Sequence, residues 1–421
     1  MDQGNTAFIL IAAALVLLMT PGLAFFYGGL VKAKSVISMM MMSFGALGLI
    51  GVLWVLYGYA IAFPGDEGTL APWAIDTGAL GLTNLLEVPE GASYPPLAFV
   101  AFQATFAIIT VALVSGAIAD RAKFGAWMVF AAIWATVVYF PVASWVFNFG
   151  LADDGSFAYG GWLTHGLQDV FGIGTIDFAG GTAVHINAGA AALALALVLG
   201  KRVGFAKGAS VPHNPPFVLL GAGLLWFGWF GFNAGSELAA DGTAALAFVN
   251  TIAAPAAALL AWLVVERIRD GKPTSVGAAS GAVAGLVAIT PACGSLTPGW
   301  AIVLGIIAGA VCALAVDLKF KLGFDDSLDV VGIHLIGGLI GTLYLGFFST
   351  TTGLAFGNDG TQLLVQAIAA FSVLIYSFVL AFIIAWVIQK TMGFRITSED
   401  EIAGVDTVVH GEEGYVLADT K

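Results

Sequence analysis

Two histidines, His185 and His334, are the side chains of this sequence best able to do chemistry within long apolar segments. Each follows an aspartate by eight residues, in Asp177-Phe-Ala-Gly-Gly-Thr-Ala-Val-His185 and in Asp326-Ser-Leu-Asp-Val-Val-Gly-Ile-His334. At about 1.5 Å per helical residue, each imidazole lies about 12 Å along the axis from its aspartate. Two desolvated imidazoles that meet form a neutral pair or share one proton, and both forms donate and accept hydrogen bonds. The pattern favours a buried path for a small polar solute.

The aspartates, and either histidine taken alone, also have structural interpretations. An aspartate at a helix N-terminus caps free amide groups and complements the helix dipole. A lone histidine in an apolar helix is commonly a satisfied packing residue, but the repeated spacing favours a shared pathway. Asp177 lies at the outer mouth of its segment, where a cation would arrive. A capping role and a functional role are therefore both possible interpretations of Asp177.

Aromatic and hydroxyl side chains form a second candidate site. The sequence carries the i, i+4 aromatic pair of Phe102-Gln-Ala-Thr-Phe106 and the segment Trp229-Phe-Gly-Phe232-Asn-Ala-Gly-Ser236. An aromatic face attracts a desolvated cation by up to about 2 kcal/mol, and a serine oxygen accepts a hydrogen bond from an N–H group. Ordinary packing or an interfacial belt is the structural alternative for these rings.

The composition indicates that these residues belong to a membrane protein. Of 421 residues, 59% are hydrophobic and only 10% are charged, too few to cover a soluble globule. This excludes a soluble enzyme, a nucleic-acid-binding protein and a disordered chain. The two cysteines, Cys293 and Cys312, are too few for a disulfide framework or a thiolate metal cluster.

The apolar runs have the length of membrane-spanning helices. A bilayer core of about 30 Å requires about 20 apolar residues per helix. Continuous runs rich in Ala, Leu and Gly fit helices better than the alternating strands of a β-barrel. We predict eleven spans, at residues 6–31, 36–62, 97–119, 125–149, 178–200, 215–236, 243–266, 276–291, 299–317, 330–349 and 362–390.

The basic residues indicate which side of the membrane each loop occupies. All 15 Lys and Arg residues follow odd-numbered spans, whereas the intervening loops hold acidic residues alone, including Asp66, Glu67, Asp153, Asp154 and Glu237. Since loops rich in Lys and Arg stay in the cytoplasm, the N-terminus is predicted outside and the C-terminus inside. The first span lacks a basic leader and is interpreted as a retained helix.

The two histidine segments open the fifth and tenth predicted spans, so they enter the membrane from opposite sides. This offset indicates an inverted five-plus-five repeat over residues of about 6–200 and 215–350, followed by an eleventh helix at about 362–390. Both imidazoles then reach the middle of the membrane. The sequence predicts an all-α integral membrane domain over 1–391 and a cytoplasmic tail over 392–421. The tail is either a solvated acidic end or a regulatory or subunit-contacting arm.

Several motifs together resemble the ammonium transporters of the Amt/Rh superfamily. The resemblance rests on the segment that begins at Asp177, on Phe232-Asn-Ala-Gly-Ser236 and on His334. Further similar segments follow in the family's order: Thr20-Pro-Gly-Leu-Ala-Phe-Phe-Tyr-Gly-Gly29, Phe102-Gln-Ala-Thr-Phe106, Ala247-Phe-Val-Asn-Thr251 and Thr290-Pro-Ala-Cys-Gly294. The resemblance covers nearly the whole chain. It implies a homotrimer of eleven-helix subunits in the cell membrane, each with its own narrow apolar path.

The resemblance also implies roles for single residues at the outer side. Phe106 and Ser236 would help form an ammonium recruitment site, and Asp177 resembles a buried aspartate near it. In the family a tryptophan precedes a glycine run at this site, but this chain reads Ala158-Tyr159-Gly-Gly-Trp162. Tyr159 and Trp162 are therefore alternatives for the missing aromatic ring.

Deeper in the membrane, the resemblance implies a gate and a lumen. Phe106 and Phe232 would be a stacked phenyl gate, and His185, His334 and Trp229 would line the pore. In the tail, the region from Gly404 to Tyr415 resembles a family segment that contacts a neighbouring subunit and can bind PII-type regulators. A PII-type protein at the cytoplasmic face is thus a candidate partner.

The expected function is ammonium transport. We expect ammonium to be captured outside, to lose a proton at the phenyl gate and to cross as ammonia along the histidines, with the proton handled separately. The alternatives are an ion-coupled transporter of another small substrate such as methylammonium, an ammonium sensor, and an intramembrane enzyme with His185, His334 and Asp177 as metal ligands. No metalloprotease or serine-hydrolase motif accompanies these residues, so no catalytic residue, metal or cofactor is expected.

Overall fold

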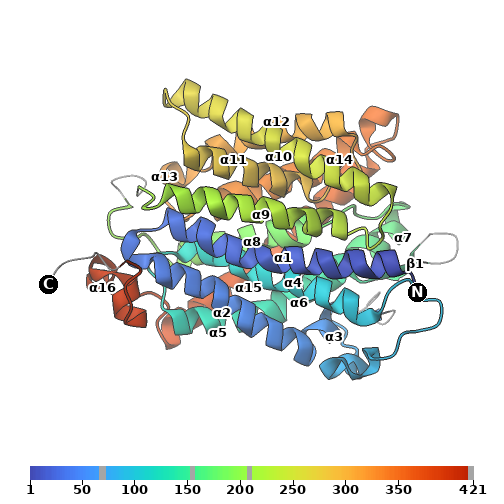
Figure 1. Ribbon diagram of the computed structural model, residues 1–421, viewed down its shortest axis with the longest axis horizontal. Coiled ribbons are helices and arrows are strands. Elements are labelled where there is room, and N and C mark those ends of the chain that lie inside the picture. Colours follow the sequence, from blue (N-terminus) through green and yellow to red (C-terminus); the bar gives the residue numbers. More distant parts are fainter. Residues whose placement is uncertain (66–72, 152–156, 206–210, 416–421) are drawn as a thin grey trace.

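The computed structural model describes residues 1–65, 73–151, 157–205 and 211–415 as a bundle of long helices lying side by side (Figure 1). The N-terminus lies at one end of the bundle, here called the N end, and the tail helix α16 lies at the opposite C end. Some charged residues lie outside the described residues: Asp66, Glu67, Asp153, Asp154, Lys207 and Lys421.

The first half of the chain contains the elements up to the first histidine helix. Where a short 3-10 or π segment joins two helices, the helix changes its hydrogen-bond pattern without ending. The elements are α1 (Gln3–Leu30), η1 (Ala33–Ser35), α2 (Val36–Leu53), η2 (Trp54–Gly58), α3 (Tyr59–Ala62), the kinked η4 (Thr77–Leu85), α4 (Pro96–Val114), η5 (Ser115–Ile118), α5 (Phe124–Trp134), η6 (Ala135–Tyr139), α6 (Phe140–Phe147), β1 (Phe149–Leu151), β2 (Phe157–Gly160), η7 (Trp162–Gly166), α7 (Leu167–Phe171), η8 (Gly181–Ile186) and α8 (Asn187–Leu199).

The second half repeats this use of long helices and adds the tail. Its second histidine segment, η10, again opens a helix with a π turn. The elements are α9 (Pro215–Gly235), α10 (Gly242–Arg269), α11 (Ser275–Ile289), α12 (Pro298–Ala315), α13 (Leu318–Leu322), η10 (Val331–Leu335), α14 (Ile336–Phe348), η11 (Leu354–Phe356), α15 (Thr361–Thr391), α16 (Ser398–Ala403) and η12 (Asp406–His410).

Caps and prolines fix where several helices begin. Asp2 accepts a hydrogen bond from Asn5 N at the start of α1, and Asp241 accepts from Thr243 N and Ala244 N at the start of α10. Helices α4, α9 and α12 begin with proline, whose fixed φ suits the first helical turn and whose missing N–H needs no partner there. The predicted boundaries therefore agree with the helices to within a few residues.

Ten helical segments of the described chain are long and apolar enough to cross a membrane. The predicted span at 276–291 corresponds to α11, which has 15 residues and is shorter than a bilayer crossing usually requires. Nearly all of α11 is buried, and it packs against α9, α10, α12 and α14. Protein rather than lipid surrounds this helix, so its length is not set by the bilayer.

The site helices are held in the centre of the bundle. Helix α1 packs along α9, α8 packs along α15, and α14 contacts η8 (Figure 1). One departure from an all-helical chain is the antiparallel pair β1–β2, in which Gly150 lies opposite Tyr159. This hairpin belongs to a loop at the N end that the hydropathy pattern could not assign.

Candidate functional site

Two cavities approach each other inside the bundle. The wide cavity, at the N end, has a volume of about 990 Å³, and the narrow cavity, deeper in the bundle, has a volume of about 10 Å³. A cavity needs about 10–15 Å³ by this measure to hold one water molecule, so the narrow cavity suits a single molecule of that size. The narrow cavity is lined by Met19, Leu23, Phe26, Ile109, Leu113, Val184, His185, Leu225, Trp229, Phe232, Val283 and His334.

Two stacked phenyl rings form the wall between the cavities. Phe106 from α4 lines the wide cavity, and Phe232 from α9 lines the narrow one. Their ring centroids are 4.1 Å apart with an interplanar angle of 21°, and each residue is 1% exposed. Because stacked rings leave no water-sized gap between them, a solute passes only when a ring moves.

The two predicted histidines meet directly beneath this stack. The Nδ1 atoms of His185 and His334 are 3.1 Å apart, and both rings are buried. One ring donates and the other accepts, so the two cannot carry the same neutral tautomer. Nε2 of His185 has no hydrogen-bond partner among the described residues, and both histidines line the narrow cavity. The pair therefore offers hydrogen-bonding capacity to a small molecule there.

Trp229 completes one wall of the narrow cavity. Its indole ring stacks on His185 with 5.4 Å between centroids and an interplanar angle of 22°. Its Nε1–H donates to the Oγ1 atom of Thr290 at 2.9 Å, which satisfies the buried donor and fixes the ring.

Each histidine segment begins in the same way. Oδ2 of Asp177 accepts hydrogen bonds from Thr182 N and Ala183 N, and Oδ2 of Asp326 accepts from Val331 N. Both aspartates thus cap the π turns η8 and η10 that carry the histidines. The capping interpretation holds for both. Asp177 also lines the wide cavity, and its Oδ1 atom has no hydrogen-bond partner among the described residues.

Glycines let the two histidine helices approach closely, and they do so reciprocally. Gly189 lies four residues after His185, and a Cβ atom there would be 2.5 Å from Leu335 N. Gly338 lies four residues after His334, and a Cβ atom there would be 2.9 Å from Gly181 O and 3.0 Å from Ile186 Cγ1. Glycine at matching positions of both segments brings the backbones together so that short imidazoles can meet.

The wide cavity gathers most of the predicted recruitment residues. Ser236, Asp177 and Tyr159 line it together with Phe106. Trp162 is not among the described residues that line it, and its ring packs on Trp145 at 5.6 Å. A Cβ atom on Gly150 would lie 2.3 Å from the Tyr159 ring, so glycine at this strand position is what lets that ring take its place.

Sequence reasoning missed several residues of the site. It did not predict the π turns, the contact of Trp229 with Thr290, or the role of Gly189. The shared pattern of histidine followed four residues later by glycine was available in the sequence as a signal. Among the described residues, no three His, Cys, Asp or Glu side chains gather as they would around a metal ion.

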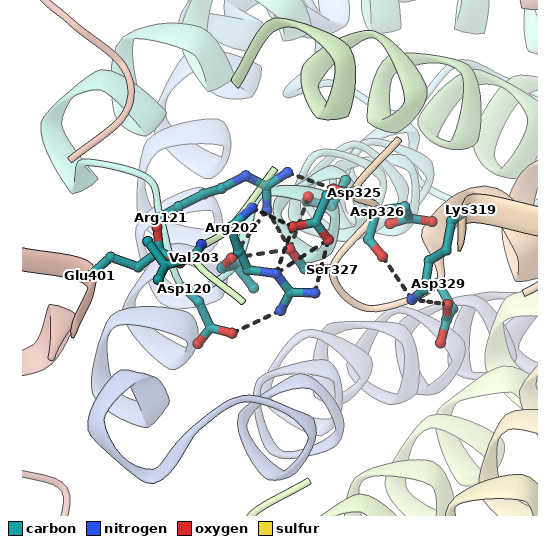
Figure 2. A network of polar contacts seen from close by, with 12 residues as sticks. Asp120, Arg121, Arg202, Val203, Lys319, Asp325, Asp326, Ser327, Asp329 and Glu401 are labelled. Carbon is teal, nitrogen blue, oxygen red and sulfur yellow. Dashed lines mark hydrogen bonds and ion pairs between the residues drawn. The ribbon is translucent and has the colours of Figure 1, made fainter. Parts of the chain in front are cut away.

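A buried ionic network ties the site helices together at the C end (Figure 2). Arg202, which follows α8, donates to Asp120 and Asp325, and its side chain is 9% exposed. Asp120 follows η5, and Asp325 precedes η10, so the network joins the segments that carry Phe106, His185 and His334. Burial raises the pKa of Asp325, but the hydrogen bonds and charge of Arg202 outweigh it and hold that pKa below its ordinary value.

The tail takes part in the same network. Glu401 of α16 accepts a hydrogen bond from Val203 N at 2.7 Å and pairs with Arg395 at 3.0 Å. In η12, the carboxylate of Asp406 accepts from Ile37 N and Ser38 N and so caps the start of α2. Through these contacts the described part of the tail lies against the C end of the bundle.

Comparisons with known proteins agree with this geometry. The model of the Ammonium Transporter Family matches residues 7–415. An ammonium transporter of Mycobacterium tuberculosis is 53% identical over 444 residues, which cover 99% of this chain and 91% of that protein. A crystal structure of Mep2 from Saccharomyces cerevisiae is 33% identical with a TM-score of 0.83, and the match covers 94% of this chain and 91% of that one.

A further solved structure, described as a sensor Amt protein, has a TM-score of 0.85 and 28% identity, and the match covers 97% of this chain and 98% of that one. The family is one of transport proteins rather than enzymes, and the apolar helices make the chain a multi-pass membrane protein. From the family match over nearly all its residues and from its close mycobacterial relative, we conclude that the chain belongs to the ammonium transporter family.

Proposed function

We propose that this chain captures ammonium in the wide cavity, removes a proton at the Phe106–Phe232 stack, and conducts ammonia past His185 and His334. The observation that carries the proposal is the histidine pair, 3.1 Å between Nδ1 atoms, in a cavity sized for one small molecule directly beneath stacked rings. The proton is handled by a separate route.

The physical chemistry of the narrow cavity supports passage of neutral ammonia rather than of the ammonium ion. Moving a bare ion through an apolar passage requires several kcal/mol of desolvation free energy. Neutral ammonia needs only hydrogen-bond partners, which the imidazole nitrogens supply. Potassium has no proton to release, so the same passage rejects it.

For the capture step, we assign recruitment to Phe106, Tyr159 and Ser236, with Asp177 as a buried support. All four line the wide cavity, and aromatic faces attract cations by up to about 2 kcal/mol at desolvated sites. The position of Trp162 beside Trp145 favours Tyr159 as the ring that completes the site.

We further propose the arrangement of the chain in the membrane. The wide cavity faces outward, the N-terminus lies outside, and the C-terminus lies inside, in keeping with the Lys and Arg residues that follow odd-numbered spans. Helix α11 serves as the eleventh crossing, shielded by its neighbours. The membrane domain extends over 1–391 and the cytoplasmic tail over 392–421, and three such chains assemble in the cell membrane.

The tail is the surface we assign to a regulator of the PII type. The contacts of Glu401 and Asp406 hold the described tail residues against the C end, where a cytoplasmic protein can reach them. The structural similarity to a sensor Amt protein is in keeping with regulatory partners.

The alternative transport and sensor functions are not favoured. An ion-coupled transporter of another small substrate, such as methylammonium, is expected to have a midplane cavity larger than about 10 Å³. The relatives at 45–53% identity are described as ammonium transporters, whereas the sensor Amt protein is 28% identical, so a pure sensor is less favoured.

The test is ammonium-evoked current and labelled methylammonium uptake in proteoliposomes. We expect His185→Ala and His334→Ala each to lower transport by at least about tenfold, since each removes a hydrogen-bond partner from the passage. His410→Ala, in the tail, should retain wild-type transport and serves as the control. Unaltered transport and selectivity against potassium in both pore variants would refute the proposal.

A further inference from the structure

An acidic side chain in the wide cavity has no part in the mechanism above. Glu237 directly follows Ser236 and lines the same cavity, half-buried. No Lys or Arg lies among the described residues that line this cavity, and no ion pair to Glu237 is found in the described chain. The carboxyl group is thus not neutralised by a resident cation.

The turn that carries Glu237 closes helix α9 tightly. Glu237 N donates to Ala234 O, and Leu238 N donates to Gly235 O. Leu238 has a φ of 59°, in the left-handed region that a leucine rarely adopts. The chain therefore keeps a strained turn that holds Glu237 next to Ser236 at the cavity.

The groups that face Glu237 make its charge sensitive to pH. Burial, followed by the neighbouring Asp241, raises the pKa of Glu237 to about 7. Asp241 caps α10, and Asp177 lines the same cavity. The other titratable groups that line the cavity are tyrosines, Tyr59, Tyr94 and Tyr159. No basic group of the described lining opposes these acids.

A second observation points independently to a ligand that donates hydrogen bonds. Gln103 from α4 lines the wide cavity, is 7% exposed, and its Oε1 atom has no partner among the described residues. Oδ1 of Asp177, 8% exposed at the residue level, is likewise without a partner there. Unsatisfied buried acceptors are costly, and a cation with several N–H donors would satisfy them.

We propose that Glu237 is a cation-concentrating residue, which with the acceptor of Gln103 draws ammonium and small primary alkylammonium ions into the wide cavity. The inference rests on the proposed function and extends it to the enrichment of the substrate before the phenyl stack. Its carboxylate acts through charge, while the aromatic rings and Ser236 provide the final contacts.

The test measures how ammonium-evoked current in proteoliposomes saturates for the wild type, Glu237→Gln and Glu237→Asp. At pH 8 and low ionic strength we expect Glu237→Gln to raise KM about three- to tenfold with little change in maximal current. Glu237→Asp keeps the charge and should restore most of the affinity. Asp359→Asn, an exposed acid at the start of α15, is the matched control and should keep the wild-type KM.

The pH profile separates charge from structure. Since the ionised carboxylate attracts the cation, the wild-type KM should rise as pH falls through about 7 and approach the KM of Glu237→Gln near pH 5.5. The KM of Glu237→Gln itself should not change over this pH range. Added salt should shrink the difference at pH 8. An unchanged KM in Glu237→Gln at pH 8, or an equal pH profile in both proteins, would overturn this inference. Failure of the proposed function differs, because the wild type would then show neither ammonium-evoked current nor labelled methylammonium uptake.

Discussion

The hydrogen bond between the two histidines dictates how their rings are protonated. With Nδ1 facing Nδ1 at 3.1 Å, a neutral pair contains one Nδ1–H donor and one Nδ1 acceptor. If His185 donates, its Nε2 accepts from a solute in the narrow cavity, and if it accepts, its Nε2–H donates. Ammonia both donates and accepts, so either arrangement serves it.

The stack of Trp229 on His185 makes the indole orientation part of this geometry, and it leads to a prediction about stability. Thr290→Val should leave the Trp229 N–H unpaired in a buried site and lower the free energy of unfolding by about 1–3 kcal/mol. Thermal unfolding in detergent measures it. In a Trp229→Phe background the same substitution should cost about 1 kcal/mol less, because the orphaned donor is gone. Strictly additive effects of the two substitutions would contradict this.

At the scale of elements, the hydropathy pattern predicted the helices well, because a lipid-facing or buried helix must be apolar along its whole length. It could not predict that His185 and His334 lie in π turns, since apolar content does not determine which carbonyl an amide binds. The Asp–His spacing predicted that the imidazoles share one region, and the structure brings them into contact.

The aromatic residue of the wide cavity could not be chosen from sequence. Tyr159 lines that cavity because its ring lies over Gly150 of the neighbouring strand, a tertiary contact that no local pattern encodes. Likewise, the sequence predicts α11 as a membrane span, although this short helix is surrounded by other helices of the protein. Contacts between distant segments decide both points.

The reciprocal glycine contacts predict how the two histidine helices respond to added bulk. Gly189→Ala would set a Cβ atom 2.5 Å from the Leu335 backbone, so the helices must separate, with a loss of about 1–3 kcal/mol in stability and reduced transport. Gly338→Ala should act in the same direction but less strongly, since the nearest atoms to its Cβ would lie at 2.9–3.2 Å rather than at 2.5–2.7 Å.

Gly223→Ala is the matched control for these variants. It lies on α9 with no other atom within 4 Å of the added Cβ, so it should be neutral or stabilising by up to about 1 kcal/mol. Detergent unfolding and proteoliposome uptake give the two readouts. If Gly189→Ala behaved as Gly223→Ala does, close approach of the helices would not be what positions the histidines.

At the scale of the whole molecule, the network of Figure 2 joins segments that are distant in sequence. Arg202 connects Asp120 with Asp325, and Arg121 donates to Ser327 and to the backbone oxygen of Asp325. Burial lowers the pKa of Arg121 to about 10, so its guanidinium remains charged at neutral pH. Two buried arginines thus hold together, at the C end of the bundle, the segments that line the passage.

This network predicts that removal of Arg202 reverses the pH dependence of stability. Arg202→Leu leaves Asp120 and Asp325, which are 1% and 0% exposed, as unpaired buried carboxylates, and should cost about 3–5 kcal/mol at pH 7. Because Arg202 holds the pKa of Asp325 below its ordinary value, the wild type keeps that stabilisation above about pH 4 and loses it below. Unpaired carboxylates instead favour protonation, so the variant should gain stability as pH falls from 7 towards 5. Unfolding in detergent across this range measures both slopes.

Arg269→Leu is the control, because it removes an arginine that is 35% exposed and pairs with Asp270 at the surface. It should change the free energy of unfolding by less than about 1 kcal/mol. Parallel pH profiles of Arg202→Leu and the wild type would rule out this role for Arg202.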